Sequence, residues 1–261
     1  MEAKKSFGQH FLKDASIVRK IIDAADFSLF DSVVEIGPGQ GALTDHLVGL
    51  PPFMGGREGG FRLVLIEADR DLIQDLEKNY QAEVIQADAA KVDFDSLKLG
   101  NWLLIGNLPY NAANAIIMNA LTAFNPPQKS IVMIQKEVAD RMLAQPGQMS
   151  LLSVAVQLYA DPKRLFNVKP GSFLPPPKVT SSVIELTIAK KTTDPERIIS
   201  LAKAGFQNRR KQLHRNLTDT NIMDSADVKK TLQAIKKKTT VRAQELSVAD
   251  WIDLASKISK K

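Results

Sequence analysis

The sequence predicts a doubly wound α/β domain followed by a small all-helical domain. Short, continuous apolar runs recur along the first two thirds of the 261 residues, with helical stretches between them. Continuous rather than alternating apolar character is typical of parallel strands covered on both faces. After residue 189 these runs give way to a polar linker and to helical patterns, so we place the two domains at residues 1–189 and 190–261.

The elements of the first domain follow one another in the order expected of α/β units. Five apolar runs indicate strands, namely Val33–Ile36, Leu63–Ile66, Glu83–Gln86, Trp102–Ile105 and Ile131–Ile134. Four helices are predicted, namely Asp69–Lys78, Asn114–Phe124, Lys136–Leu143 and Leu151–Tyr159, the last capped by Ser150. Two β-rich segments, Arg164–Val168 and Ser182–Ile188, are expected to close the sheet as an antiparallel pair. Residues 51–60, rich in Gly and Pro, predict a surface loop.

The second domain is predicted to be helical and basic. Pro195 ends a polar linker at a place suited to begin a helix, and helices are expected at Glu196–Phe206, Asp227–Ile235 and Val248–Ile258. Residues 1–189 carry a net charge of −3 and residues 190–261 carry +9. This asymmetry favours a polyanionic partner, either nucleic acid or an acidic membrane surface, although solvated helix faces are the alternative.

Composition excludes several classes of protein. The chain has no cysteine, which excludes disulfide scaffolds, thiol nucleophiles and cysteine-ligated metals. The three histidines lack metal-ligand spacing, so no metal is expected. No apolar run approaches the roughly 20 residues of a membrane span, and the start lacks the apolar core of a signal peptide. We therefore expect a soluble cytoplasmic protein without a membrane partner.

A glycine-rich turn after the first predicted strand indicates a nucleotide cofactor. Gly37, Gly39 and Gly41 follow Glu35 in a Glu-x-Gly-x-Gly-x-Gly pattern. Glycines there allow a sharp turn and close approach of the backbone to a ligand. The dinucleotide fingerprint has different spacing and is built around a pyrophosphate. The acidic form instead suits a cofactor with no phosphate and a positively charged amino-acid portion, such as S-adenosylmethionine.

Two further acids follow successive strands. Glu67 ends the second predicted strand, where a carboxylate can accept hydrogen bonds from both ribose hydroxyls. Asp88 ends the third, where it can accept from the exocyclic amine of an adenine. Open α/β sheets bind ligands at the carboxyl ends of their strands, so both acids are expected at one site.

The fourth strand runs into Asn107-Leu108-Pro109-Tyr110, a tetrapeptide suited to methylation of an adenine amine. The lone pair of that nitrogen is delocalised into the ring. The Asn107 side-chain oxygen and the Leu108 carbonyl can bind its two hydrogens and direct the lone pair toward a methyl donor. Pro109 would stiffen the turn and Tyr110 would stack on the base, which contributes about 1–3 kcal/mol.

Six ordered motifs, distributed over nearly the whole chain, carry a family resemblance. They are Phe7-Gly8-Gln9-His10-Phe11-Leu12, Glu35-Ile36-Gly37-Pro38-Gly39, Asn107-Leu108-Pro109-Tyr110, Gln135-Lys136-Glu137-Val138, Phe173-Leu174-Pro175-Pro176-Pro177-Lys178-Val179 and Phe206-Gln207-Asn208-Arg209-Arg210-Lys211. With them the chain resembles the small-subunit (16S) rRNA adenine N6,N6-dimethyltransferases, the RsmA/KsgA family. The resemblance implies a Rossmann-like, S-adenosylmethionine-dependent methyltransferase domain with a small rRNA-binding helical domain.

The resemblance also implies roles for cofactor-site residues. His10 and Leu12 would line the cofactor site, and Gly37 would touch the methionine portion of S-adenosylmethionine. Glu67 would bind the ribose and Asp88 the adenine, and Asn107 is also counted among the cofactor-binding residues. The activity it implies is dimethylation of two adjacent adenines in the 3′-terminal hairpin loop of 16S rRNA, within a small-subunit assembly particle and linked to ribosome biogenesis. We expect a monomer.

The RNA side of the site is implied in the same way. Asn107 would bind the target amine, and Phe173 would pack on the flipped base opposite Tyr110. The basic residues of the last motif, with one more a turn later, are expected to contact rRNA phosphates at helical spacing; they are Arg209, Arg210, Lys211 and Arg215. Lys260 and Lys261 are expected to be solvated. Residues 111–114, Asn-Ala-Ala-Asn, depart from the Asn-Ile-Ser/Thr that often follows the tetrapeptide.

Four other functions fit the sequence less well. Large-subunit rRNA adenine dimethylases of the macrolide-resistance type more often carry Asn-Ile-Pro-Tyr and lack Pro-Pro-Pro-Lys-Val, and DNA adenine methylases more often use Asn/Asp-Pro-Pro-Tyr/Phe. A ribosome-assembly factor with little turnover is disfavoured by the intact tetrapeptide and both cofactor acids. A dehydrogenase is disfavoured by the glycine spacing.

Overall fold

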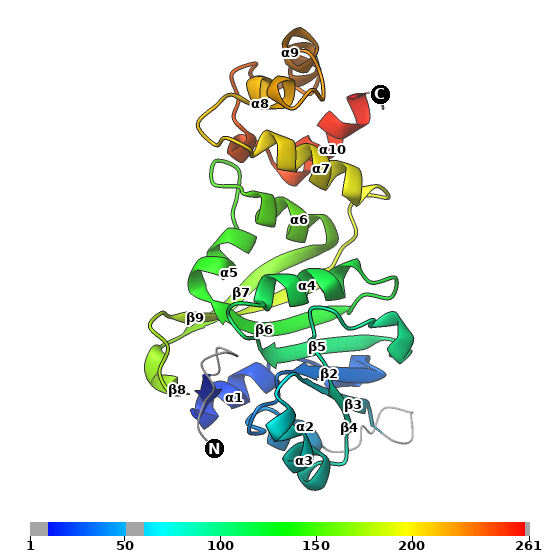
Figure 1. The fold of residues 1–261 in the computed structure, drawn as a ribbon, viewed down its shortest axis with the longest axis vertical. Helices are drawn as coiled ribbons and strands as arrows, with labels where there is room; N and C mark the ends of the chain where they lie inside the picture. The colour runs from blue at the N-terminus through cyan, green and yellow to red at the C-terminus, as the bar shows by residue number, and fades with distance from the viewer. Residues whose placement is uncertain (1–9, 51–59, 259–261) are drawn as a thin grey trace. The chain divides into compact units, whose positions relative to one another are not determined.

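A computed structural model describes residues 10–50 and 60–258 of the chain (Figure 1). The predicted loop at 51–60 lies outside these residues, except for Gly60. Phe7–Gln9, Lys260 and Lys261 also lie outside them. The chain forms two compact units. One comprises Met1–Ala139 with Pro162–Ile188, and the other comprises Asp140–Asp161 with Ala189–Lys261.

The first unit is built on a seven-stranded sheet whose strand order is β4-β3-β2-β5-β6-β9-β7 (Figure 1). The strands are β2 Ser32–Ile36, β3 Arg62–Glu67, β4 Glu83–Gln86, β5 Trp102–Asn107, β6 Lys129–Gln135, β7 Ala160–Val168 and β9 Ser181–Ile188. The first five of these are parallel to one another, and β9 is antiparallel to β6. The predicted doubly wound α/β class is confirmed, with β9 and β7 adjacent at its end.

Burial explains why these segments form the sheet. Every residue of β2 is buried, and only Asn107 of β5 is partly exposed. Such strands need helices on both faces, because neither face meets water. The helices of this part of the chain are α1 Ala15–Ile22, α2 Thr44–Val48, α3 Arg70–Asn79, α4 Ala113–Thr122 and α5 Lys136–Met142.

One of these helices, α1, was not predicted from the sequence, and α2 was expected after the glycine-rich turn but without bounds. Helix α1 begins after Asp14, whose carboxylate accepts a hydrogen bond from Ser16 N at 3.1 Å, and it buries Val18, Ile21 and Ile22. Helix α2 has only five residues and no side-chain hydrogen bond at its N-cap. A helix that short leaves little periodic pattern for a sequence analysis to detect.

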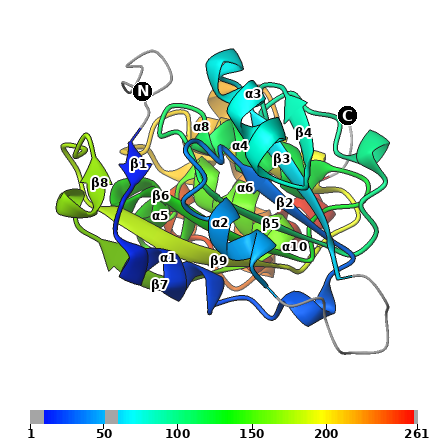
Figure 2. The same cartoon turned by 90° about the horizontal axis from the view of Figure 1, so that it is seen from below.

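A second, two-stranded sheet pairs distant parts of the chain. Strand β1, Phe11–Leu12, is antiparallel to β8, Phe173–Leu174, and Figure 2 shows the two side by side. Lys13 N donates to Ser172 O at 2.9 Å, and Ser172 Oγ donates to Asp14 Oδ2 at 3.0 Å. The N-terminal segment and the loop that carries the proline run are therefore one structural piece.

The second unit is helical. Its helices are α6 Leu151–Tyr159, α7 Pro195–Gly205, α8 Leu213–Asp219, α9 Ser225–Ala234 and α10 Val248–Lys257. Helix α7 packs against α6, α8 and α10. The prediction that the C-terminal part of the chain is helical is confirmed. Ser150 caps α6 as predicted, in a reciprocal arrangement with Ser153.

The two compact units differ from the predicted domains, which have a single boundary near residue 190. Residues 140–161 group with the C-terminal helices, and residues 162–188 return to the sheet. The physical reason is the apolar character of α6, which buries six of its nine residues and so needs a helical neighbour on more than one side. Within residues 10–50 and 60–258, no helix combines the length and the apolar character needed to span a bilayer.

Candidate active site

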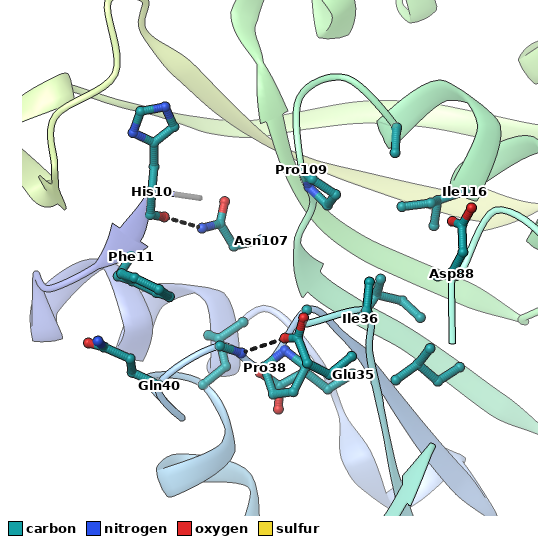
Figure 3. A pocket seen from close by; sticks show the side chains of 18 of the residues that line it. His10, Phe11, Glu35, Ile36, Pro38, Gln40, Asp88, Asn107, Pro109 and Ile116 are labelled. Carbon is teal, nitrogen blue, oxygen red and sulfur yellow. Dashed lines mark hydrogen bonds between the residues drawn. The ribbon is translucent and has the colours of Figure 1, made fainter. Parts of the chain in front are cut away.

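A cavity of about 510 Å3 opens in the first unit at the carboxyl ends of β2, β3, β4 and β5 (Figure 3). This volume is within the range of small-ligand sites. Its wall comes from the segments 10–12, 35–43, 66–68, 86–89 and 107–116. The carboxyl ends of strands are where open α/β sheets bind ligands, so the strand order itself produces the site.

The glycine-rich turn forms one wall of the cavity. Gly37, Gly39 and Gly41 have φ of +67°, +58° and +88°, a region that residues with a Cβ rarely adopt. Gly37 N donates to Ile66 O at 2.9 Å, which attaches the turn to the end of β3. The turn therefore reverses the chain between β2 and α2 as the sequence predicts.

Glu35 lies beneath this turn and is 1% exposed. Its carboxylate accepts a hydrogen bond from Thr44 Oγ1 at 2.7 Å. Burial raises the pKa of Glu35 to about 8, and the hydrogen bond from Thr44 only partly opposes this rise. The carboxyl is therefore mostly protonated at neutral pH, and a positive charge nearby would favour its ionised form.

Glu67 connects the glycine-rich turn to β3. Its carboxylate accepts from Gly39 N at 3.2 Å and from Asp69 N at 2.9 Å. Burial raises the pKa of Glu67, and the backbone N–H groups of Asp69, Gly39 and Ala68 oppose the rise. The side chain lines the cavity, where sequence analysis placed a ribose-binding acid.

Asp88 lies across the cavity on the segment after β4. Asn119, which sequence analysis missed, anchors that segment by donating from Nδ2 to Ala89 O at 3.1 Å and to Val92 O at 2.8 Å. A polar side chain within the apolar helix α4 was the available signal. Asp88 Oδ1 accepts from Ala90 N at 3.1 Å.

Asn107 and Tyr110 are held in place by the segments around them. Asn107 Nδ2 donates to the main-chain carbonyl of His10 at 2.9 Å (Figure 3). Tyr110 Oη shares a 2.6 Å hydrogen bond with Ser181 Oγ, and its ring centroid lies 5.6 Å from that of His10. Burial raises the pKa of Tyr110, which stays a neutral phenol. Pro109 also lines the cavity, whereas the side chain of Leu108 is buried.

The structure brings His10, Leu12, Gly37, Glu67, Asp88, Asn107, Pro109 and Tyr110 to one cavity. Phe173 is not among the residues that line it. Its side chain is 1% exposed and packs in the hydrophobic core with Leu12 and Val168. Successive side chains of a strand point to opposite faces, so Leu174 is the exposed residue of β8, at 61%. Phe173 therefore does not face the cavity in this structure, and its packing on a flipped base opposite Tyr110 stays a prediction.

The basic residues of the second unit are placed partly as expected. Arg209, Arg210, Lys211 and Arg215 are all exposed. The first three lie in the turn between α7 and α8 and not at helical spacing, while Arg215 is on α8. Asn208 Oδ1 accepts from Arg210 N at 3.1 Å, and Lys211 Nζ pairs with Asp219 at 2.7 Å. The bond from Arg210 N to Asn208 forms an Asx turn, which shapes the backbone between α7 and α8.

The acidic side chains around the cavity suit a positively charged cofactor. Glu35, Glu67 and Asp88 line it, and none of the described residues around it is lysine or arginine. Three carboxyl groups would disfavour a phosphate when ionised, whereas they favour a positively charged sulfur and an ammonium group. The residues present therefore fit S-adenosylmethionine better than a dinucleotide.

Comparison with known proteins agrees with this geometry. Residues 1–260 match the family described as "Ribosomal RNA adenine dimethylase". The chain is 40% identical to "Ribosomal RNA small subunit methyltransferase A" of Xanthomonas oryzae pv. oryzae (strain PXO99A), over 97% of this chain and 95% of that protein. The protein of the same name from Xanthomonas campestris pv. campestris (strain B100) has the same identity and coverage.

Solved structures share the fold. A dimethyladenosine transferase from Plasmodium falciparum superimposes with a TM-score of 0.76 at 27% identity, covering 94% of this chain and 96% of that one. The 23S rRNA methyltransferase ErmE superimposes with a TM-score of 0.72 at 21% identity, covering 95% and 99%, which is evidence for the fold only. The family match and the full-length identity together show that the chain belongs to the ribosomal RNA adenine dimethylase family, whose members are S-adenosylmethionine-dependent methyltransferases.

Proposed function

We propose that this protein dimethylates N6 of two adjacent adenines in the 3′-terminal hairpin loop of 16S rRNA, within a small-subunit assembly particle. The observation that carries the proposal is the position of Asn107 at the rim of a cavity that also holds Glu67 and Asp88. The names of the 40% identical relatives supply the small-subunit target. We also propose that the protein acts as a monomer in the cytoplasm.

The acids of the cavity would hold the cofactor. Glu67 would accept hydrogen bonds from the ribose and Asp88 from the adenine, and Gly37 would let the backbone approach the methionine portion. Glu35, buried beneath the turn, would complement the positive end electrostatically. When bound, S-adenosylmethionine supplies a methyl group already activated by its positively charged sulfur.

Asn107 would act on the second reactant. A carbonyl oxygen can only accept hydrogen bonds, so the bond to His10 O requires that the amide NH2 group faces His10. The amide oxygen of Asn107 is then the free end that can accept a hydrogen from an adenine amine. The main-chain carbonyl of Leu108 would accept the other hydrogen. The lone pair of the nitrogen would then point away from both acceptors, toward the methyl donor.

Tyr110 would position the base. Its hydroxyl is held by Ser181, which sets the orientation of the ring for stacking on an extruded adenine. The step needs no strong base, because the proton of the amine can leave after the methyl group has moved. Holding both reactants in line then supplies most of the acceleration.

The decisive experiment incubates the full chain with labelled S-adenosylmethionine and unmethylated small or large ribosomal particles, followed by mapping of modified adenines. Label on two adjacent adenines of small particles is the expected result. Label confined to large particles would support the macrolide-resistance type of enzyme instead. Binding of particles without label would support an assembly factor with little turnover.

A further inference from the structure

Gly41, the third glycine of the turn, lies against the side chain of Tyr80. A Cβ at Gly41 would be 1.9 Å from Tyr80 Oη and 2.9 Å from Tyr80 Cζ. The same atom at Gly37 would meet only the Asn107 carbonyl oxygen, at an ordinary contact distance of 3.6 Å. Gly41 therefore lacks a side chain for a reason that lies within the protein: it makes room for a tyrosine hydroxyl.

Tyr80 is joined to the turn by a chain of hydrogen bonds. Its hydroxyl donates to Asp45 Oδ1 at 2.5 Å, and Asp45 N donates to Gly41 O at 2.8 Å. Gly41 N in turn donates to Pro38 O at 2.9 Å. Tyr80 is thus linked to Gly41 through Asp45, and its hydroxyl also occupies the space that a side chain at Gly41 would need.

Helix α2 depends on side-chain supports of this kind. It has five residues, and Leu43 at its N-cap provides no side-chain hydrogen bond. Helices this short have little stability of their own. The side chains of its first two residues form hydrogen bonds with different parts of the unit. Thr44 donates to the buried Glu35, and Asp45 accepts from Tyr80.

Tyr80 is itself well anchored. It follows the last residue of α3, its main-chain N donates to Leu76 O at 3.0 Å, and its ring packs against the hydrophobic core. Burial and the neighbouring Asp45 carboxylate raise the pKa of Tyr80, so its hydroxyl keeps its proton and remains a donor. A charge-assisted hydrogen bond of this type is stronger than a neutral one.

We infer that Tyr80 is a positioning residue for S-adenosylmethionine, acting through Asp45 and Gly41 on the glycine-rich turn. Tyr80 does not line the cavity and belongs to none of the motifs that define the family resemblance. Its effect is expected on the binding of the cofactor and not on the transfer of the methyl group, because the turn would contact the cofactor and holds none of the residues proposed to bind the adenine.

The first test removes only the hydroxyl. In the full chain, Tyr80→Phe is expected to weaken S-adenosylmethionine binding about tenfold, the value of one hydrogen bond to a charged group. Titration calorimetry without RNA measures this Kd. At saturating cofactor and RNA, kcat should stay within about twofold of wild type while the KM for cofactor rises. An unchanged Kd, or a loss confined to kcat, would overturn the inference.

The matched control is Tyr159→Phe. Tyr159 is a buried tyrosine on α6 whose pKa is also raised by burial, and it belongs to the other unit. This variant should leave the cofactor Kd unchanged. A similar loss in both variants would mean that general destabilisation weakens binding, which would also contradict the inference. Thermal unfolding without cofactor shows how far each variant remains folded.

The second test examines the contact with Gly41. Gly41→Ala should weaken cofactor binding at least 100-fold in the wild-type background. In a Tyr80→Ala background it should cost only about tenfold, because the unfavourable φ of +88° remains but the hydroxyl is gone. An equal penalty in both backgrounds would show that Gly41 serves only its backbone angle. Because these measurements use no RNA, they can fail or succeed independently of the proposed rRNA target.

Discussion

The side-chain amide of Asn107 donates its hydrogen bond to the main-chain carbonyl of His10, across 2.9 Å. This bond joins the end of β5 to the segment that enters β1. His10 Nδ1 also lies 2.8 Å from Pro175 O in the proline-rich loop. The residue proposed to hold the target amine is thus oriented by the chain's N-terminal segment, which is itself attached to that loop.

Replacing Asn107 tests its proposed role. Asn107→Ala should abolish methyl transfer to rRNA, because the amine loses an acceptor that aligns its lone pair. Cofactor binding should stay within a few-fold of wild type, since Glu67 and Asp88 are untouched. Methyl transfer to small-subunit particles and calorimetric titration with S-adenosylmethionine measure the two effects. Asn114→Ala, an exposed change on α4, is the control and should retain activity. Near-normal turnover of the Asn107 variant would contradict the role.

Glu35 should make the stability of the cofactor-free protein depend on pH. Its folded pKa of about 8 exceeds the ordinary 4.5, so the folded state holds a proton that the unfolded state has lost between these values. Stability should therefore fall as pH rises from about 5 to 8. Glu35→Gln does not titrate, and the comparison of its melting temperatures with those of wild type isolates the effect. Equal pH dependence in both proteins would rule it out.

The same group should give cofactor binding the opposite dependence on pH. A positive ligand favours the ionised carboxylate, so the affinity for S-adenosylmethionine should increase as pH rises toward 8. Calorimetry in buffers of different ionisation enthalpy should detect proton release on binding by wild type. Glu35→Gln should release correspondingly fewer protons. Identical proton release would assign the linkage to another group.

Charge reversal at Arg209 and Arg210 tests the proposed RNA contacts. The double change to Glu should weaken binding to small-subunit particles and reduce the salt slope by roughly one for each phosphate that is no longer neutralised. The matched control reverses Lys236 and Lys238, which are also exposed and change the net charge equally. If both pairs reduce the slope alike, net charge and not the α7–α8 turn explains the effect.

Phe173 should behave as a core residue. Phe173→Ala is expected to lower the free energy of unfolding by about 3–5 kcal/mol, because a fully buried aromatic side chain is removed. Leu174→Ala, the exposed neighbour on the same strand, should change it by less than about 1 kcal/mol. Urea denaturation measures both. Similar stability of the two variants would mean that Phe173 leaves the core in solution.

Local patterns predicted most of the sheet. All five parallel strands lie within two residues of their predicted bounds, and four of them contain a continuous apolar run of the kind that a doubly covered sheet requires. Glu67 ends β3 as predicted, and Asp88 follows the end of β4 by two residues. The short helix α2 and the two-residue strands β1 and β8 carry too few residues to produce a periodic signal.

The amino-acid sequence by itself determined the α/β class, the helical basic tail and the residues that gather at the carboxyl ends of the strands. Periodicity and glycine spacing are local properties, so they can be recognised without tertiary contacts. Only the tertiary structure decided that Phe173 lies in the core, that residues 140–161 pack with the C-terminal helices, and that Tyr80 occupies the space left by Gly41. Each of these depends on which surfaces meet across long stretches of chain, and steric fit between distant residues leaves no periodic trace in sequence.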